Sequence, residues 1–237
     1  MSKDASRERR DAARKSRRFG PSKAGVQVAP GQSEGQVLSV MRSLLGRPRA
    51  KLEDTANLAG APDDARVAAA VIPMHGRRII EVVAENPLIR IKVRLYTRSD
   101  GKPILDDELI DVIPVAQQHG FGTRFLGRQV EQALRLGIVE IRAYAIRGDQ
   151  GGDVGYRVWP IFGFDGPLPR EVIEELPPEL CAARNVSDLM GTREGREWWI
   201  RNGDDINLTF DLSPKSPALR RFRTYLRRKG FPRPEPE

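Results

Sequence analysis

Apolar and polar residues alternate in several segments of the chain, and a period of two predicts strands with one buried face. The clearest alternation covers residues 89–96, 139–145 and 206–212. A mostly apolar run at residues 79–83 suits a buried strand, and residues 108–113 predict a further strand. These segments together predict a central β-sheet.

Other segments follow the helical period, in which apolar residues recur every three or four positions. Residues 34–45 form such a pattern and end at Gly46-Arg-Pro48. The segment after Gly122 places apolar and charged residues on opposite faces, and Gly137 is expected to end that helix. Ser216-Pro217 is a favourable helix start, with serine as cap and proline at the first position. The alanine-rich residues 63–71 are also predicted to form a helix. A short helix is predicted at residues 194–201.

A glycine-bearing turn at residues 117–124 lies between the strand predicted at 108–113 and the helix that ends at Gly137. Gly120 and Gly122 allow close approach to a ligand, and the start of a helix presents free N–H groups. The turn is therefore a candidate anion site, most plausibly for a pyrophosphate. A P-loop is excluded because Thr123 and Arg124 follow Gly122 where Lys and Ser/Thr are needed. Phe125 replaces the small residue that a dinucleotide-binding turn requires.

The spacing Gln117-x-x-Gly120-x-Gly122 resembles the pyrophosphate-binding motif of the GCN5-related N-acetyltransferases, the GNAT family. The order of elements after the turn agrees with that family, and residues 159–164 resemble the aromatic-x-x-x-Gly-Phe ending of its next helix. The resemblance covers residues 77–165. It implies an α/β (α+β) fold with a GNAT-like mixed central sheet and helices on both faces, in one domain over residues 33–231. The alternative is an αβ unit whose glycines only make a tight turn.

The resemblance implies acetyl-CoA, or another acyl-CoA, as cofactor and N-acylation of an unidentified amine as activity. The cofactor-binding residues would be Val115, Ala116, Gln117, Gln118, His119, Gly120, Phe121, Gly122, Thr123 and Arg124. Glu108 or Asp111 would be the base that takes the ammonium proton, with Asp107 a weaker candidate. Trp159 stands where the family usually has a tyrosine acid, so Tyr156, three residues before it, is the substitute candidate. With one cysteine and two histidines, no metal site is expected.

The charge of the chain gathers at its two ends. Residues 1–23 and 215–237 each carry a net charge of +6 within a total of +8, which leaves residues 24–214 at −4. We expect residues 1–32 to form a disordered basic arm and 232–237 a short tail. Basic ends of this kind suit non-specific contact with nucleic acid or another polyanion. Residues 90–94 add a basic stripe on one predicted strand face.

No apolar run approaches the roughly 20 residues of a membrane span, and no signal segment is visible, so a cytoplasmic protein without a membrane partner is expected. Two functions remain open. The chain is either an acyl-CoA-dependent acyltransferase or a non-catalytic module of the same fold, tethered to nucleic acid or a larger assembly through its basic termini. A nucleic-acid-binding protein unrelated to acyl transfer is a weaker possibility.

Overall fold

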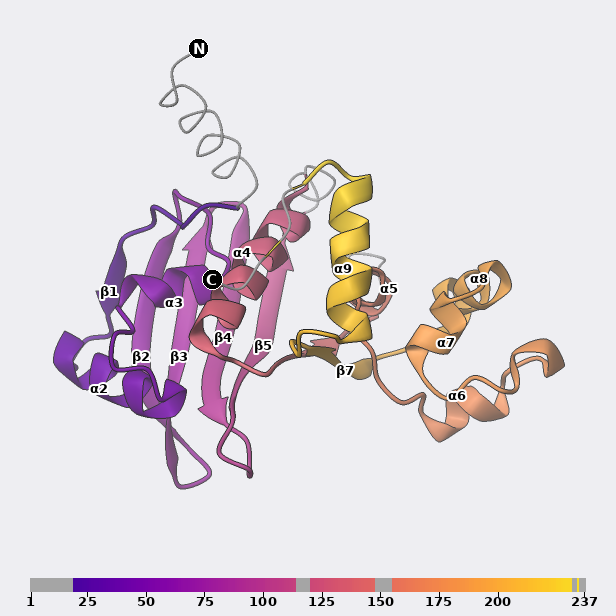
Figure 1. Ribbon diagram of the computed structural model, residues 1–237, viewed down its shortest axis with the longest axis horizontal. Helices are drawn as coiled ribbons and strands as arrows, with labels where there is room; N and C mark the ends of the chain where they lie inside the picture. The colour runs from indigo at the N-terminus through magenta and orange to yellow at the C-terminus, as the bar shows by residue number, and fades with distance from the viewer. Residues whose placement is uncertain (1–18, 114–119, 148–154, 232–233, 235–237) are drawn as a thin grey trace, which may run out of the picture.

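The computed structural model describes residues 19–113, 120–147, 155–231 and 234. These residues form a mixed α+β fold with one seven-stranded sheet and eight α-helices (Figure 1). Such an architecture is compatible with a GNAT-like fold. No helix among the described residues is long and apolar enough to cross a membrane.

The sheet has its strands in sequence order, from β1 at one edge to β7 at the other. Strands β2 to β5 are an antiparallel meander, whereas β1 pairs with β2, and β6 with β5, in parallel; β7 is antiparallel to β6. The strands are β1 (Val26–Val28), β2 (Arg66–Met74), β3 (Arg77–Asn86), β4 (Ile89–Thr97), β5 (Pro103–Val112), β6 (Glu140–Ala145) and β7 (Ile206–Asp211).

The helices begin and end at caps that the sequence specifies locally. Ser33 caps α2 by accepting from the N–H of Gln36 at 3.2 Å, and Ser216 caps the last helix by accepting from Leu219 at 3.1 Å. Both predicted starts are therefore confirmed. The helices are α2 (Glu34–Leu45), α3 (Glu53–Leu58), α4 (Phe121–Leu136), α5 (Gly155–Phe162), α6 (Arg170–Glu174), α7 (Val186–Met190), α8 (Arg193–Asn202) and α9 (Pro217–Arg228), with a 3₁₀ turn at Pro178–Leu180.

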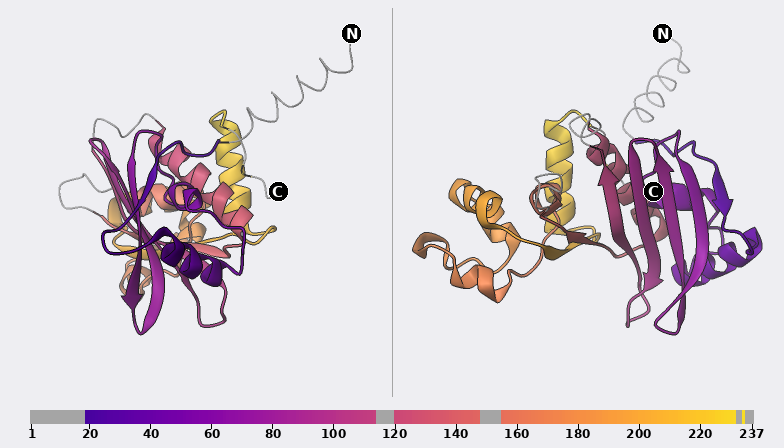
Figure 2. Two further views of the ribbon diagram at one scale, coloured as in Figure 1. Left: turned by 90° about the vertical axis from the view of Figure 1, so that its left-hand side faces the viewer. Right: turned by 180° about the vertical axis from the view of Figure 1, so that it is seen from behind.

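Helices α2, α3 and α4 lie on one face of strands β1 to β5, and no described helix covers the opposite face of these strands (Figure 2). Side chains such as Val67, Ile91 and Leu105 point to the covered face and are buried with Phe125 of α4. The expectation of helices on both faces is therefore wrong for this part of the sheet. Its open face carries polar and charged residues, which explains how it remains exposed.

The helix predicted at residues 63–71 is wrong, because most of this segment belongs to strand β2. Val67, Ala69 and Val71 are buried, and the alanines between them lie on the open face. Alanine favours a helix by only a few tenths of a kcal/mol per residue over most alternatives. Pairing along the whole length of β3 outweighs that preference.

The boundary predicted at residue 32 for the basic arm is wrong, because residues 19–32 belong to the described structure. Val26–Val28 form β1, and Phe19 lies against α4, where its N–H donates to Glu131 at 3.2 Å. A Cβ atom at Gly127 would clash with the Phe19 ring, so the two positions fit each other closely. The folded part thus begins by residue 19, and residues 1–18 lie outside the described residues, as does most of the predicted tail at 232–237.

The basic stripe of β4 is on the open face, as predicted, but carboxylates accompany it. Arg94 lies 3.0 Å from a carboxylate oxygen of Glu81 on β3 and 2.7 Å from one of Glu108 on β5. Tyr96 donates to Asp106 at 2.9 Å. Because each neighbouring strand brings acids to the stripe, this face is a balanced charge network rather than a surface for polyanions.

Candidate functional site

The N-terminal turn of α4 has the local structure expected of an anion site. Gly120, the N-cap, has φ 72°, a left-handed conformation that glycine adopts without strain, and no side chain caps the helix. Among the described residues no side chain caps the first N–H groups of this 16-residue helix, and the helix dipole adds partial positive charge there. The predicted residues Gly120, Phe121, Gly122, Thr123 and Arg124 all belong to this turn.

Aromatic side chains from distant parts of the chain surround the turn. A Cβ atom at Gly120 would lie 3.3 Å from the Phe231 ring, and one at Gly122 would lie 3.8 Å from the Phe162 ring of α5. The hydroxyl groups of Thr123 and Tyr225 lie 3.1 Å apart, which ties α4 to α9. The remaining predicted cofactor contacts, Val115, Ala116, Gln117, Gln118 and His119, lie outside the described residues.

The parallel strands β5 and β6 separate as they approach this end of the molecule. They pair over four positions only, from Ile104 opposite Glu140 to Asp107 opposite Ala143. Strand β5 then continues for residues 108–112 with no β6 partner in the described chain. A bulge at Glu108, which has no counterpart on β4 between Lys92 and Val93, accompanies the change of course. The ladder between the two parallel strands therefore ends before β5 itself does.

The carboxylates predicted as bases lie on the open face of the sheet. Glu108 forms the ion pair with Arg94, and Asp111 is exposed opposite Arg90 in the β4–β5 register. Both are on the strand that leads to the glycine turn, as expected, and neither contacts α4 in the described structure. Their role as bases stays a prediction.

Asp107, on the covered face of the same strand, is the residue whose importance was underestimated. Its Oδ1 accepts from Nε2 of Gln129 at 2.7 Å, and the same amide donates to the carbonyl of Leu58 at 3.0 Å. Burial raises the pKa of the Asp107 carboxyl well above its usual range, and the Gln129 hydrogen bond opposes this only in part. Oδ2 of Asp107 and Oε1 of Gln129 are both buried, and neither has a hydrogen-bond partner among the described residues. A proton on Oδ2 would let the acid donate back to the amide and satisfy both atoms.

Tyr156 is buried, and its position suits a structural role. Its hydroxyl donates to the carbonyl of Ile200 at 2.9 Å, and its own carbonyl accepts from the Trp199 indole at 2.8 Å. Trp159, at the position where the family has its usual tyrosine, packs against Phe164 with ring centroids 4.8 Å apart. Neither side chain presents a free proton donor to the α4 turn.

Replacing Tyr156 with phenylalanine should therefore lower the free energy of unfolding by about 1 kcal/mol, because one buried hydrogen bond is lost and the Ile200 carbonyl remains. Any acyl transfer should continue at close to the parent rate. Urea unfolding and a thiol-release assay with acetyl-CoA measure the two effects. A rate loss of about a hundredfold or more would instead restore Tyr156 as the general acid.

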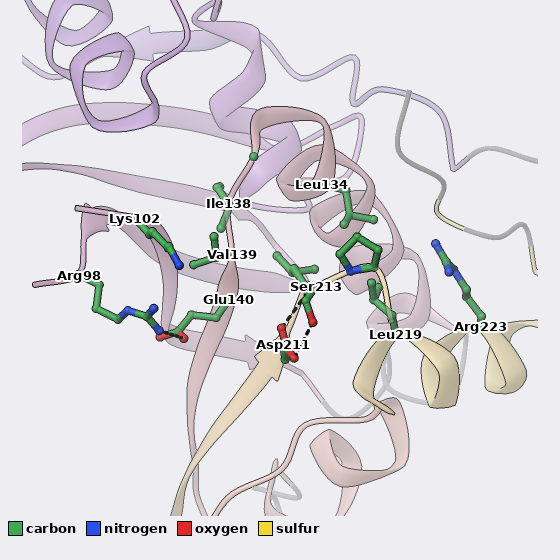
Figure 3. Close-up of a pocket in the computed structure, with 13 residues that line it drawn as sticks. Arg98, Lys102, Leu134, Ile138, Val139, Glu140, Asp211, Ser213, Leu219 and Arg223 are labelled. Carbon is green, nitrogen blue, oxygen red and sulfur yellow. Dashed lines mark hydrogen bonds and ion pairs between the residues drawn. The ribbon is translucent and has the colours of Figure 1, made fainter. Parts of the chain in front are cut away.

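A cavity of about 810 Å³ lies at the other end of α4 and so is separate from the glycine turn (Figure 3). Its walls come from the β4–β5 connection, the loop after α4, the end of β7 and the start of α9. Lys102, Glu140, Asp211 and Arg223 are among its polar lining residues. The helix between the two sites has 16 residues, which corresponds to about 24 Å.

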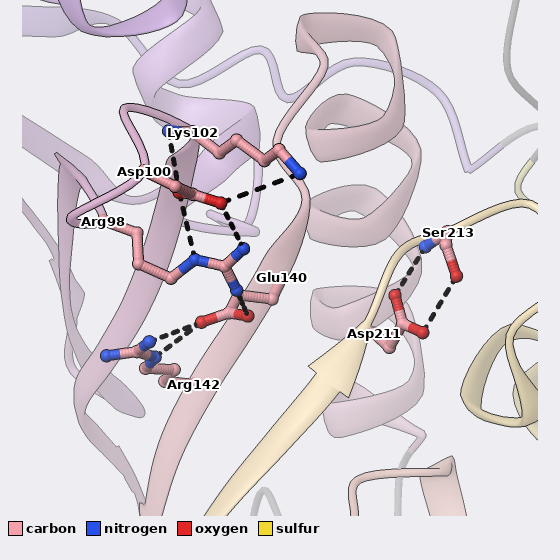
Figure 4. A network of polar contacts seen from close by, with 7 residues as sticks. All are labelled: Arg98, Asp100, Lys102, Glu140, Arg142, Asp211 and Ser213. Carbon is pink, nitrogen blue, oxygen red and sulfur yellow. Dashed lines mark hydrogen bonds and ion pairs between the residues drawn. The ribbon is translucent and has the colours of Figure 1, made fainter.

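An ion-pair network occupies one wall of this cavity (Figure 4). Glu140 accepts from Arg98 at 2.8 Å and from Arg142 at 2.7 Å. The Arg98 guanidinium also holds the pKa of the Asp100 carboxyl below its usual range through a hydrogen bond, while Lys102 is 3.6 Å from that carboxylate. With its charges paired, this wall is better explained as a clamp between the β4–β5 turn and β6 than as a binding surface.

No group of His, Cys, Asp or Glu side chains in the described ranges could hold a metal ion. No protein-family model matches this chain, and no curated protein matches it either.

Proposed function

We propose that this protein is an acyl-CoA-dependent N-acyltransferase, with acetyl-CoA as the simplest donor and an amine as acceptor. The observation that carries the proposal is the parting of β5 and β6 directly before the uncapped N-terminus of α4. A slot between parallel strands suits an extended pantetheine chain, and the helix N-terminus beyond it suits a pyrophosphate. The resemblance of residues 117–122 to the GNAT motif points the same way.

The residues at the turn fit the proposed cofactor. Gly120 lacks a side chain where a Cβ atom would approach Phe231, and its left-handed backbone lets the chain enter the helix with its N–H groups outward. Gly122 likewise keeps the first turn open. When bound, acyl-CoA supplies the acyl group as a thioester, and this part of the chain would hold its phosphates.

Proton transfer would depend on the carboxylates of β5. An amine acceptor must lose a proton before it can attack, and Glu108 or Asp111 is the base we assign to that step. Glu108 is favoured because the bulge places it where β5 leaves β6. With Tyr156 and Trp159 committed to packing, we assign no side chain as acid for the departing thiolate, which takes its proton from water.

Replacing Gly122 with glutamate tests the cofactor site. The position has ordinary backbone geometry and room for a Cβ atom, so the variant should fold, while its carboxylate repels a pyrophosphate at the helix start. We expect acetyl-CoA binding by calorimetry to weaken at least roughly tenfold, since a like charge in contact costs on the order of 1.4 kcal/mol or more. Gly35→Glu is the matched control, because Gly35 lies in the first turn of α2 with open space around it. Equal binding by both variants and the parent would refute the assignment.

A non-catalytic module of the same fold is the second candidate, and the engagement of Tyr156 and Trp159 in packing favours it. Such a module would bind acetyl-CoA without turnover. A panel of primary amines, with free thiol measured over time, separates the two functions. Replacing Glu108 with glutamine should abolish thiol release that the enzyme catalyses. It should leave the uncatalysed background release unchanged.

A further inference from the structure

A second concave surface of about 520 Å³ lies between α5, α8 and α9, away from the large cavity. We call it the arginine groove, after four of its lining residues: Arg196, Arg220, Arg221 and Arg228. Helix α9 contributes Arg220, Arg221 and Arg228 to the groove, and α8 contributes Arg196. No Asp or Glu is among the residues that line the groove.

Within the described chain, no carboxylate pairs with the arginines of the groove, although several other arginines of the protein are held in ion pairs. Arg94, Arg170 and Arg193 each pair with a glutamate at 3.0 Å or less. In the groove, Arg196 donates to the backbone carbonyl of Thr192 in its own helix, and Arg220, Arg221 and Arg228 form no ion pair within the part of the chain that the structure describes. Several like charges brought together without counter-charges create a local potential that attracts anions.

Part of the lining of the groove, which we call its floor, is apolar. Ile161 is 45% exposed there, and Pro160, Met190 and the ring of Tyr225 also line it. An exposed apolar floor under a cationic rim suits a ligand in which charged groups alternate with flat, weakly polar ones. Such a surface is poorly matched to a small inorganic anion, which has no apolar part to cover the floor.

The spacing of the cations also indicates a repeating ligand. Arg220 and Arg228 are eight residues apart on α9, which corresponds to about 12 Å along the helix axis. With their side chains extended, these two arginines are matched better by separate phosphate groups than by one. A chain with a negative charge on every unit can engage them in succession.

We propose that the arginine groove binds a single-stranded nucleic acid, with backbone phosphates on the arginines and sugars or bases against Tyr225 and Ile161. Guanidinium groups bind phosphate oxygens bidentately, and aromatic rings accept any base by stacking. Contact of this kind carries little sequence preference. It places a nucleic-acid surface on the folded domain, separate from the basic segment at residues 1–18.

The test compares two double variants of the full chain that lose equal charge from the same region. Arg220→Ala with Arg228→Ala removes two groove cations. Arg227→Ala with Lys229→Ala removes two exposed cations that do not line the groove. Binding of a short dye-labelled oligothymidylate is followed by fluorescence anisotropy over a range of salt concentrations, and circular dichroism checks that both variants fold.

The groove variant should bind on the order of tenfold more weakly than the parent near 0.1 M salt. The slope of log affinity against log salt should become shallower by about 1.4, because each lost phosphate contact on a single strand removes about 0.7. The control variant should lose clearly less affinity. Equal losses in the two variants would overturn the groove as the site. Displacement of the oligonucleotide by polyglutamate at equal charge, or by millimolar inorganic phosphate, would overturn the nucleic acid as its ligand.

Discussion

The free energy of unfolding of the parent should fall as the pH rises above about 4. Replacing Asp107 with asparagine should remove this fall. Burial raises the pKa of this carboxyl in the folded protein, so the folded state keeps a proton that the unfolded chain releases near pH 4. Because the folded state then binds more protons, the free energy of unfolding falls with rising pH. The fall is about 1.4 kcal/mol per pH unit and continues until the pH passes the folded-state pKa.

Asparagine is the informative substitution because it reproduces the protonated acid. Its Nδ2 can donate to Oε1 of Gln129 while its Oδ1 accepts from Nε2, so both atoms that lack partners in the parent are satisfied. Urea unfolding at a series of pH values measures the difference between parent and variant. The difference should be small near pH 4 and should grow toward neutrality in favour of the asparagine variant.

Asp106→Asn provides the matched control, since Asp106 is the adjacent residue on the open face and is only half-buried. Its amide oxygen can still accept from Tyr96, so this variant removes a neighbouring carboxylate while leaving the Asp107–Gln129 contact in place. If the parent and Asp107→Asn have the same pH dependence, the carboxyl ionises normally and the acid–amide pair does not exist.

The Asp107 and Gln129 pair also joins the parts of the molecule that the proposed acyl-transfer site requires. Gln129 connects α4 to β5 through Asp107 and to α3 through the carbonyl of Leu58. The connection lies one residue before the bulge at which β5 leaves β6. A neutral pair holds α4 in place there without burying a net charge, which would cost far more.

The sequence predicted those features that depend on neighbouring residues. The extent of α2, the serine cap of α9 and the end of α4 at Gly137, which has φ 78°, follow from local sequence and backbone chemistry. Strand β2 was missed because its alanines are neutral between helix and strand until β3 pairs with them. Pairing with a distant strand has no local signature.

The candidate site was predictable to a similar extent. The glycines of the α4 turn could be recognised in the sequence. The hydrogen-bond partners of Tyr156, which are Trp199 and Ile200, could not, because they lie more than 40 residues further along the chain. Gln129 did leave a signal, since it falls between Phe125, Leu126 and Val130 on the apolar face of its helix. A polar residue in such a stripe needs a buried partner, and Asp107 alternates with Leu105 toward the same face.

Replacing Trp199 with alanine should lower the free energy of unfolding by about 3–5 kcal/mol, the range for large aromatic residues in cores. Trp199 is fully buried, and the other buried residue of α8 is a glycine, Gly195. The indole N–H of Trp199 also donates a hydrogen bond to the carbonyl of Tyr156. The side chain therefore anchors the α7 and α8 region to α5, and its removal leaves a large cavity and an unpaired carbonyl together.

Two further substitutions separate these effects. Trp199→Phe keeps most of the ring volume but loses the N–H donor, so its cost should be closer to 1–3 kcal/mol. Trp198→Ala, at the half-buried neighbour, should cost about 1 kcal/mol. Urea unfolding gives the three values, and hydrogen exchange shows where protection is lost. Loss should concentrate in α5, α7 and α8 and leave the β2–β4 amides protected, because these strands pair with one another and not with the helices that Trp199 holds. A Trp199→Ala variant no less stable than Trp198→Ala would show that α8 is held by other contacts.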